Sequence, residues 1–284
     1  MSAETQTKPK ACIIGWPASH SRSPLIHGFW LDRLKIAGSY ERAAIPPDRF
    51  ADFVGALARN GFVGANVTLP HKQMAFDLCH VATQTAARLQ AVNTLWLEGE
   101  RLCGDNTDVE GFLGALDQDA PGWDSQIAQA VVLGAGGAAR AIVHGLLLRG
   151  AARILVVNRT KARALELAAQ AGAPVAAADW ADLPCALREA DLLVNTTSLG
   201  MSGQPPLEID LSLLPARAVV SDIVYVPLET GLLRQAKARG LRAVSGIGML
   251  LHQAAPGFAR WFGEEPCVSA ELRALVEADV LKSM

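Results

Sequence analysis

The feature that most constrains this chain is a glycine-rich segment between an apolar run and an amphipathic one. Residues 130–133 are Ala-Val-Val-Leu, which is typical of a short buried strand, and Gly-Ala-Gly-Gly-Ala-Ala follows at once. Apolar residues then recur at helical spacing as far as Gly150. A strand, a glycine turn and a helix in this order form the unit that binds a dinucleotide in parallel α/β sheets.

The small residues of this turn each have a steric reason. Gly134 allows a tight turn, Gly136 lets the backbone approach a pyrophosphate, and Ala139 stands where only a small side chain lets the helix pack on the strand. The helix N-terminus then faces the phosphates. We therefore expect the cofactor to contact Gly134, Ala135, Gly136, Gly137 and Ala138.

The end of the next strand predicts which dinucleotide binds. Residues 154–157 are a second apolar run, and Asn158 follows near the place where NAD enzymes carry an acid for the ribose 2′-hydroxyl. Three cations stand around this point instead, at Arg159, Lys161 and Arg163. Cations at a helix N-terminus oppose the helix dipole, so a bound 2′-phosphate explains them better than a solvated loop does. The sequence predicts NADP, held by Asn158, Arg159, Thr160 and Arg163.

Composition limits the class of protein and of partner. A chain of 284 residues can form one large domain or two modest ones. A net charge of −2 gives no general attraction to nucleic acid or to an anionic membrane, so a small-molecule partner is expected. The first ten residues are polar and no apolar run is long enough to span a bilayer, which predicts a cytoplasmic protein. The 5 cysteines lie far apart without a Cys-x-x-Cys pair, so we expect neither disulfides nor a metal site.

Hydroxyl groups gather after the first predicted strand, residues 11–15. The loop that follows carries several serines beside Arg22, and Pro24 is well placed to begin a helix with Ser23 as its N-cap. One cap needs one hydroxyl, whereas this loop supplies more, at the carboxyl end of a strand, where α/β sheets bind ligands. We therefore expect a small anionic or polyhydroxyl ligand beside Ser21 and Ser23.

The first half of the chain continues as an alternation of strands and helices. We expect a strand at 39–45, a helix at 47–59, a strand at 62–67 and a hairpin at 91–103. The third strand delivers Lys72 to its carboxyl edge, although from spacing alone a lysine there is more often a solvated charge. The polar segment that ends at Asp108 is where we place the domain boundary.

The second half is predicted to be a Rossmann-type, doubly wound parallel sheet with right-handed crossovers. Further strands are expected at 191–198, 218–225 and 241–244, and helices at 162–171 and 228–239. Gly246 opens another helix, and a final helix at 269–281 is expected to return to the first domain. The predicted architecture is an α/β substrate domain of residues 1–108 plus 247–284 and an NADP domain of residues 109–246.

Several motifs, taken together, closely resemble the shikimate dehydrogenase family over nearly the whole chain. They are Ser19-His20-Ser21-Arg22-Ser23-Pro24, Asn66-Val67-Thr68-Leu69-Pro70-His71-Lys72, Ala91-Val92-Asn93-Thr94, Gly104-Asp105-Asn106-Thr107-Asp108, the glycine turn, Asn158-Arg159-Thr160, and Gly248-Met249-Leu250 to Gln253. The resemblance implies an enzyme of aromatic amino-acid biosynthesis that interconverts shikimate and 3-dehydroshikimate with NADP, in a cleft between two domains.

The resemblance also implies roles for single residues. Ser21 and Ser23 would bind the substrate carboxylate, and Lys72 would be the acid/base, with Asp108 orienting its ammonium group and the ring hydroxyl. Gly246 is expected beside the cofactor. The remaining residues expected around the substrate are Thr68, Asn93, Tyr225 and Gln253.

Two departures from the family pattern concern substrate choice. Gly231 stands where many relatives carry proline, and Ser245-Gly246-Ile247 replaces the more usual Asp-Gly-Leu. Quinate/shikimate and aminoshikimate dehydrogenases share the same lysine and aspartate, so the sequence leaves these activities open. It also leaves open a non-catalytic protein that senses NADP or shikimate-like metabolites, although intact Lys72 and Asp108 argue against one. The sequence is compatible with both a monomer and a homodimer.

Overall fold

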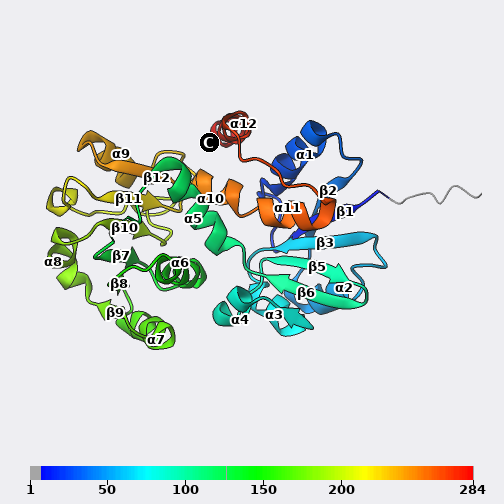
Figure 1. Ribbon diagram of the computed structural model, residues 1–284, viewed down its shortest axis with the longest axis horizontal. Coiled ribbons are helices and arrows are strands. Elements are labelled where there is room, and N and C mark those ends of the chain that lie inside the picture. Colours follow the sequence, from blue (N-terminus) through cyan, green and yellow to red (C-terminus); the bar gives the residue numbers. More distant parts are fainter. Residues whose placement is uncertain (1–7, 126, 284) are drawn as a thin grey trace, which may run out of the picture. The chain divides into compact units, whose positions relative to one another are not determined.

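The structure, a computed structural model, describes residues 8–125 and 127–283, which group by their contacts into two compact units. Unit 1 comprises the described residues as far as Thr107 together with Ala254–Leu272. Unit 2 comprises Asp108–Gln253 and the described residues from Arg273 onward. Figure 1 shows each unit as a sheet covered by helices.

Unit 1 is built on a mixed six-stranded sheet in the order β2-β1-β3-β5-β6-β4. Strand β1 pairs in parallel with β2 and β3, whereas β3, β5 and β6 pair in antiparallel fashion. The elements are β1 Lys10–Gly15, α1 Ser23–Leu34, β2 Ser39–Ala44, a 3₁₀ turn at Pro47–Arg49, α2 Phe50–Gly55, β3 Phe62–Val67, α3 Lys72–Leu78, β4 Val81–Ala82, α4 Gln84–Leu89, β5 Thr94–Glu98, β6 Arg101–Asp105 and α11 Ala255–Phe262.

Helices cover both faces of this sheet because strand residues alternate between the two faces. Ile14 of β1 lies in the cluster with Phe50 of α2 and Ala75 of α3. Ala11, three residues earlier in the same strand, faces the other side of the sheet and packs with Trp261 of α11. Figure 1 shows α2, α3 and α4 on one side of the strands and α1 and α11 on the other.

Unit 2 is built on a fully parallel six-stranded sheet in the order β12-β11-β10-β7-β8-β9. This is the strand order of a Rossmann fold, with β7 as its first strand. It confirms the predicted fold class. The elements are α5 Asp108–Asp119, β7 Ala130–Leu133, α6 Gly137–Leu148, β8 Ile154–Val157, α7 Lys161–Ala171, β9 Val175–Ala178, a 3₁₀ turn at Trp180–Asp182, α8 Leu183–Arg188, β10 Leu192–Asn195, a 3₁₀ turn at Leu211–Leu213, β11 Val219–Asp222, α9 Gly231–Ala238, β12 Arg242–Ser245 and α10 Gly246–His252.

The two faces of the parallel sheet carry separate apolar clusters. Val132 and Val156 pack against α5, α6 and α7, whereas Val131 and Val157 pack against α8 and α9. Figure 1 shows these two groups of helices on opposite sides of the strands. The strands are therefore buried on both faces, which explains why they read as unbroken apolar runs in the sequence.

Several boundaries differ from those expected. The expected helix at 47–59 is a 3₁₀ turn followed by the short helix Phe50–Gly55. Strands expected at 91–97 and 218–225 are shorter, beginning at Thr94 and ending at Asp222, so that Asn93 and Tyr225 lie outside them. Runs of apolar residues continue past the last ladder hydrogen bond, and sequence pattern alone does not mark where pairing stops.

Contacts also group the C-terminal part differently from the expected domains. Helix α10 falls in unit 2 because it packs closely on α5: a side chain at Gly248 would come within 2.8 Å of Ala115. The last helix, α12 at Ala270–Lys282, was expected to return to the first domain. Instead, Arg273 makes a bidentate ion pair at 2.9 Å with Asp119 of α5. No helix within residues 8–125 and 127–283 combines the length and hydrophobicity needed to cross a bilayer.

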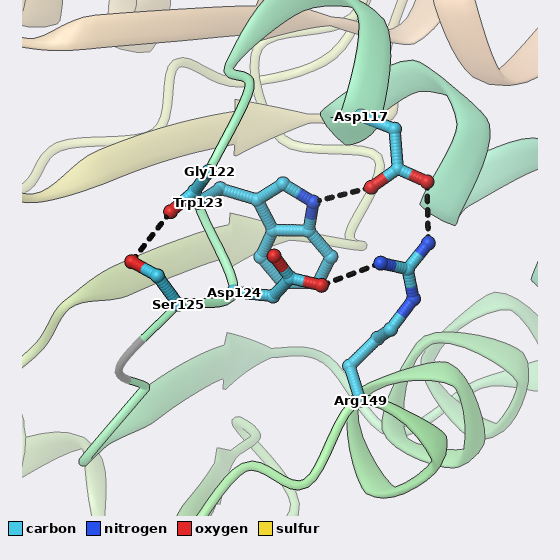
Figure 2. A network of polar contacts seen from close by, with 6 residues as sticks. All are labelled: Asp117, Gly122, Trp123, Asp124, Ser125 and Arg149. Carbon is cyan, nitrogen blue, oxygen red and sulfur yellow. Dashed lines mark hydrogen bonds and ion pairs between the residues drawn. The ribbon is translucent and has the colours of Figure 1, made fainter.

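An arginine joins the end of α6 to the end of α5 and the loop after it (Figure 2). The Arg149 guanidinium donates to Asp117 and, at 2.5 Å, to Asp124. The Trp123 indole donates to the other Asp117 oxygen at 2.8 Å and lies 5.7 Å from the guanidinium carbon. These carboxylates hold the pKa of Arg149 above its usual value, against the opposing effect of partial burial. The network fixes the chain just before β7.

We expect Arg149→Ala to lower the free energy of unfolding of unit 2. Charge-assisted hydrogen bonds and a cation–π contact are lost together, and partial exposure limits the loss to about 1–2 kcal/mol. Urea denaturation measures this loss. Arg149→Lys, which keeps the charge but not the fork, should fall between Arg149→Ala and the original chain. An Arg149→Ala protein as stable as the original would show that the network contributes nothing.

Candidate active site

The strand directions of unit 1 bring most of the expected substrate residues to one edge of its sheet. Parallel strands β1 and β3 end at this edge, and the loops after them carry Ser21 and Thr68. Strand β5 is antiparallel to β3, so Asn93, just before β5, lies at the same edge. Strand β6 ends there too, and Thr107 follows it. Residues distant in sequence therefore lie together.

The serine loop is held by hydrogen bonds from its own backbone and from β2. Ser21 Oγ donates to Ser23 Oγ at 3.2 Å and accepts from the Ser23 amide at 3.3 Å. Arg42 of β2 donates to the Ser21 carbonyl oxygen at 2.7 Å, which holds the backbone of the loop. Helix α1 begins at Ser23 with Arg22 as its N-cap, so the prediction of Ser23 as the cap is wrong. Ser21 Oγ instead accepts from the amide of Ser23, the first residue of the helix.

Lys72 is the first residue of α3, and its backbone is fixed from two sides. The buried His71 ring stacks on Phe50, with ring centroids 4.4 Å apart, and its Nε2 lies 2.8 Å from the Ile45 carbonyl oxygen. The Lys72 carbonyl accepts from the Val92 amide at 2.9 Å. Since Val92 precedes Asn93, the lysine backbone lies beside the start of β5.

Asn93 is buried, and its side-chain oxygen is held in one orientation. Oδ1 accepts from the Thr107 amide at 2.8 Å and from the hydroxyls of Thr107 and Thr94 at 3.1 and 3.0 Å. The Asn93 amide donates to the Asp105 carbonyl at 2.9 Å. Because these donors fix the position of the oxygen, they also fix the orientation of the side-chain NH₂ group.

Behind Asn93 lies a buried polar chain that sequence reasoning missed. Asn66 donates to Thr94 Oγ1 at 3.2 Å and accepts from the Tyr40 hydroxyl at 2.6 Å. The Tyr40 ring stacks on His27 at 4.0 Å between centroids, and burial lowers the pKa of His27 to about 3, so this ring is neutral. The strand expected at 39–45 was the only signal for Tyr40, and it does not identify a hydrogen-bond partner.

In unit 2 the glycine turn has the geometry that a dinucleotide requires. Gly134 has φ of +107°, which a residue with a side chain rarely adopts, and an added Cβ would lie 2.5 Å from Thr196 Oγ1. Helix α6 begins at Gly137, and its N-cap Gly136 offers no side chain to the first amides. These amides are ready to bind phosphate, and they fit a dinucleotide. Ala139 is buried against the strands, as its expected packing role requires.

The basic cluster after β8 is smaller than the sequence suggested. Lys161 lies 2.6 Å from Asp179, and this hydrogen bond and charge raise the pKa of Lys161. Arg159 and Arg163 are exposed and form no ion pair within the described residues. The Asn158 side chain donates to the Thr160 carbonyl at 2.9 Å, which shapes the turn into α7. Two arginines therefore remain for a 2′-phosphate.

The other expected site residues belong to unit 2. Tyr225 follows β11. Gln253 is the C-cap residue of α10, and its Nε2 donates to the Leu250 carbonyl at 3.1 Å. A side chain at Gly246 would lie 2.2 Å from the Ile223 carbonyl oxygen, so only glycine fits there. Asp108 is the first residue of α5 and groups with unit 2, whereas Lys72 groups with unit 1.

Comparisons with known proteins match both units of the chain. A family model described as the shikimate dehydrogenase substrate binding domain matches residues 13–95, and one described as shikimate/quinate 5-dehydrogenase matches residues 118–201. The shikimate dehydrogenase (NADP(+)) of Methylocella silvestris is 62% identical over 97% of this chain and 98% of its own length. That of Rhodopseudomonas palustris is 60% identical over 96% of this chain and 98% of its own length.

Solved structures are also similar over nearly the whole chain. Shikimate 5-dehydrogenase from Thermus thermophilus, in complex with NADP(H) and shikimate, has a TM-score of 0.82 at 35% identity, covering 97% of this chain and 100% of that one. Quinate dehydrogenase from Corynebacterium glutamicum, in complex with NAD, has a TM-score of 0.87 at 29% identity, covering 95% and 99%. Both family models match, and relatives at about 60% identity align with nearly the whole chain. The chain therefore belongs to the shikimate dehydrogenase family.

Proposed function

We propose that this chain catalyses the NADP-dependent interconversion of shikimate and 3-dehydroshikimate. The observation that carries the proposal is the pair of exposed arginines, Arg159 and Arg163, beside a complete dinucleotide turn in a chain 62% identical to a shikimate dehydrogenase (NADP(+)). Unit 1 is the proposed substrate domain and unit 2 the proposed NADP domain. The products would enter aromatic amino-acid biosynthesis.

In the proposed reaction, one ring carbon of shikimate loses a hydride while the hydroxyl on that carbon loses its proton, so an alcohol becomes a ketone. Bound NADP⁺ supplies the hydride acceptor. Lys72 Nζ takes the hydroxyl proton and returns it in the reverse direction, and Asp108 orients the ammonium group and the hydroxyl. Around the ring, Thr68, Asn93, Tyr225 and Gln253 complete the proposed binding site.

Asn93 has a geometric reason to be a donor in this proposal. Its oxygen accepts from Thr107 and Thr94, so in this proposal the NH₂ group is the end that donates to the ligand. A ring hydroxyl can accept one such hydrogen bond.

A quinate dehydrogenase is the second candidate, because a quinate dehydrogenase in complex with NAD is among the similar solved structures. The arginines at 159 and 163 favour NADP over NAD and so favour the first candidate.

The cytoplasm is the proposed compartment, which suits the free thiols at Cys12, Cys79, Cys103, Cys185 and Cys267. Monomer and homodimer both fit the proposal.

An initial-rate assay of the purified chain tests whether it is an enzyme at all. With shikimate and NADP⁺ we expect NADPH to form continuously, and 3-dehydroshikimate to be identified as the product by chromatography. Binding of NADP⁺ and shikimate without turnover would instead support a metabolite sensor. Boiled protein is the blank that excludes chemical reduction.

We expect Ser21→Ala and Ser23→Ala mainly to raise KM for shikimate. Each removes a hydroxyl that would donate to the substrate carboxylate in ground and transition state alike, so kcat should fall less than KM rises. A hydrogen bond to a charged group is worth roughly 1.5–3 kcal/mol, which corresponds to about 10- to 100-fold in KM. Steady-state kinetics measure both constants.

Ser39→Ala is the matched control, because Ser39 is an exposed serine at the amino end of β2, away from the loops after β1 and β3. It should leave KM unchanged. Unaltered KM in both Ser21→Ala and Ser23→Ala would place the carboxylate elsewhere.

A further inference from the structure

A buried carboxylate in unit 2 has no role in the chemistry described so far. Asp222 ends β11 and is fully buried, and it forms no ion pair within residues 8–125 and 127–283. Its Oδ1 accepts from Asn195 Nδ2 at 2.9 Å and from the Val224 amide at 3.1 Å. Its Oδ2 accepts from Thr230 Oγ1 at 2.7 Å. A charge buried without a cation is costly, and such groups are kept where they perform a task.

Each partner of Asp222 shapes a different segment at the carboxyl edge of the sheet. Asn195 ends β10, and its Oδ1 accepts from the amide and the hydroxyl of Thr197, at 3.0 and 2.7 Å. Asn195 Nδ2 also donates to the Leu199 carbonyl at 3.2 Å. Thr230 is the N-cap of α9, where its hydroxyl accepts from the Leu233 amide at 3.3 Å. The same hydroxyl donates its proton to Asp222 Oδ2.

These bonds suit an ionised carboxylate. Burial raises the pKa of Asp222, and the hydrogen bonds from Thr230, Val224 and Asn195 act in the opposite direction. All of these partners donate, which leaves no acceptor for an acid proton. Asp222 therefore ties the loop after β10 to the loop after β11 through its charge.

The two loops lie where the second half of a dinucleotide binds. In a Rossmann sheet one half of the cofactor occupies each three-strand half, and the glycine turn and the ribose-binding strand end belong to the first. Here β7, β8 and β9 form that adenosine half, so the nicotinamide falls to β10, β11 and β12. The loop after β10 adjoins the glycine turn, because the Thr196 amide and hydroxyl both donate to the Leu133 carbonyl, at 2.9 and 2.6 Å.

We propose that Asp222 is a positioning residue that holds the loop after β10 and the segment Val224–Tyr225 in the geometry that places the nicotinamide ring and Tyr225 for reaction. The proposal rests on the proposed function for the identity of the ligand. Asp222 bonds the amide of Val224, the residue before Tyr225, so release of this bond frees the tyrosine backbone. Displacement of a reacting group by about 1 Å can cost on the order of 10²-fold in rate.

The chain offers a matched control at the opposite end of the same strand. Asp191 immediately precedes β10, and its Oδ2 accepts from the amides of Ala128 and Gln129 at 2.8 and 3.1 Å. Its Oδ1 accepts from Arg217 Nε at 2.6 Å. Asp191 thus joins the amino ends of neighbouring strands as Asp222 joins the carboxyl ends, but it faces no ligand edge.

The test compares Asp222→Asn with Asp191→Asn in the full chain. We expect Asp222→Asn to lower kcat roughly 10- to 100-fold and to weaken NADP⁺ binding, because the nicotinamide half is no longer held. Binding of adenosine 2′,5′-bisphosphate, which lacks nicotinamide, should be unchanged by the same substitution. Asp191→Asn should leave kcat and both affinities unchanged while lowering the melting temperature.

A second pair of variants keeps the test decisive if Asp222→Asn folds poorly. Thr230→Val removes the hydroxyl but keeps the shape of the side chain. We expect it to lower kcat and NADP⁺ affinity as Asp222→Asn does, but by a smaller factor. Thr230→Ser keeps the hydroxyl and should restore kcat. Circular dichroism confirms that each variant is folded.

Equal loss of NADP⁺ and adenosine 2′,5′-bisphosphate binding in Asp222→Asn would show a general structural role and overturn the proposal. Unchanged kcat and affinities would overturn it as well. Failure of the proposed function is a separate outcome: the unsubstituted chain and Asp191→Asn would then both be inactive with shikimate, while the two binding affinities of Asp222→Asn would still report on the positioning role.

Discussion

Replacing Lys72 with alanine is expected to lower kcat about 10²–10⁴-fold, the usual contribution of general acid–base catalysis. Nothing else in the proposed mechanism accepts the proton of the substrate hydroxyl. The Lys72 backbone is fixed by the Val92 amide and by the buried His71 before it, so loss of the side chain should not move α3. Steady-state kinetics in both directions measure the effect.

Two further variants separate lost chemistry from a lost charge or a lost fold. Lys72→Arg keeps the cation, but a guanidinium group does not give up its proton in proteins and cannot act as the base, so this variant should be nearly as slow as Lys72→Ala. Asp108→Asn should lower kcat comparably, because the ammonium group loses its orienting carboxylate. NADP⁺ affinity should be unchanged in both Lys72 variants, since unit 1 carries the lysine and unit 2 the glycine turn. A Lys72→Ala enzyme with near-normal kcat would remove lysine from the mechanism.

The double substitution Arg159→Ala, Arg163→Ala should weaken NADP⁺ binding by about 10²-fold and leave NAD⁺ binding unchanged. Each arginine would lose a hydrogen bond to a phosphate, worth roughly 1.5–3 kcal/mol, and solvent reduces this value at exposed side chains. NAD⁺ has no 2′-phosphate and so has nothing to lose. Isothermal titration with both cofactors gives the two affinities directly.

Lys161→Ala is the matched control for the arginines. Lys161 lies in the same turn but is bonded to Asp179, so its removal should change NADP⁺ affinity far less than loss of the arginines does. Equal weakening of NADP⁺ and NAD⁺ in the double variant would assign the arginines to the fold rather than to cofactor choice.

The glycine turn was predictable from sequence because its chemistry is local. Gly134 and Ala139 are constrained by backbone conformation and by close packing with their neighbours, and both constraints appear in a short stretch of sequence. The apolar runs of β7, β8, β10 and β11 were equally visible, because strands buried on both faces need no alternation.

Weak strands and pairings across the sequence were not predictable. Strand β9 reads Val-Ala-Ala-Ala, and alanine favours helices, so only its pairing with β8 makes it a strand. Ion pairs such as Lys161 with Asp179 and Arg273 with Asp119 join residues far apart in the chain. Nothing in the local sequence distinguishes these cations from unpaired ones.

The candidate site was predicted as a set of residues but not as a network. The serines, Lys72 and Asn93 came from motif resemblance, and strand direction explains why those of unit 1 lie at one sheet edge. Two residues outside that set, Asn66 in unit 1 and Asp222 in unit 2, are buried polar groups near strand ends. Sequence reasoning expects apolar residues there, and only coordinates show which donors meet them.

The most direct test of the central claim is kcat/KM for shikimate and for quinate, each with NADP⁺ and with NAD⁺, on the unsubstituted chain. The account predicts the highest value for shikimate with NADP⁺, lower values when either component is exchanged, and the lowest for quinate with NAD⁺. A chain that used quinate with NAD⁺ at least as efficiently as shikimate with NADP⁺ would contradict it.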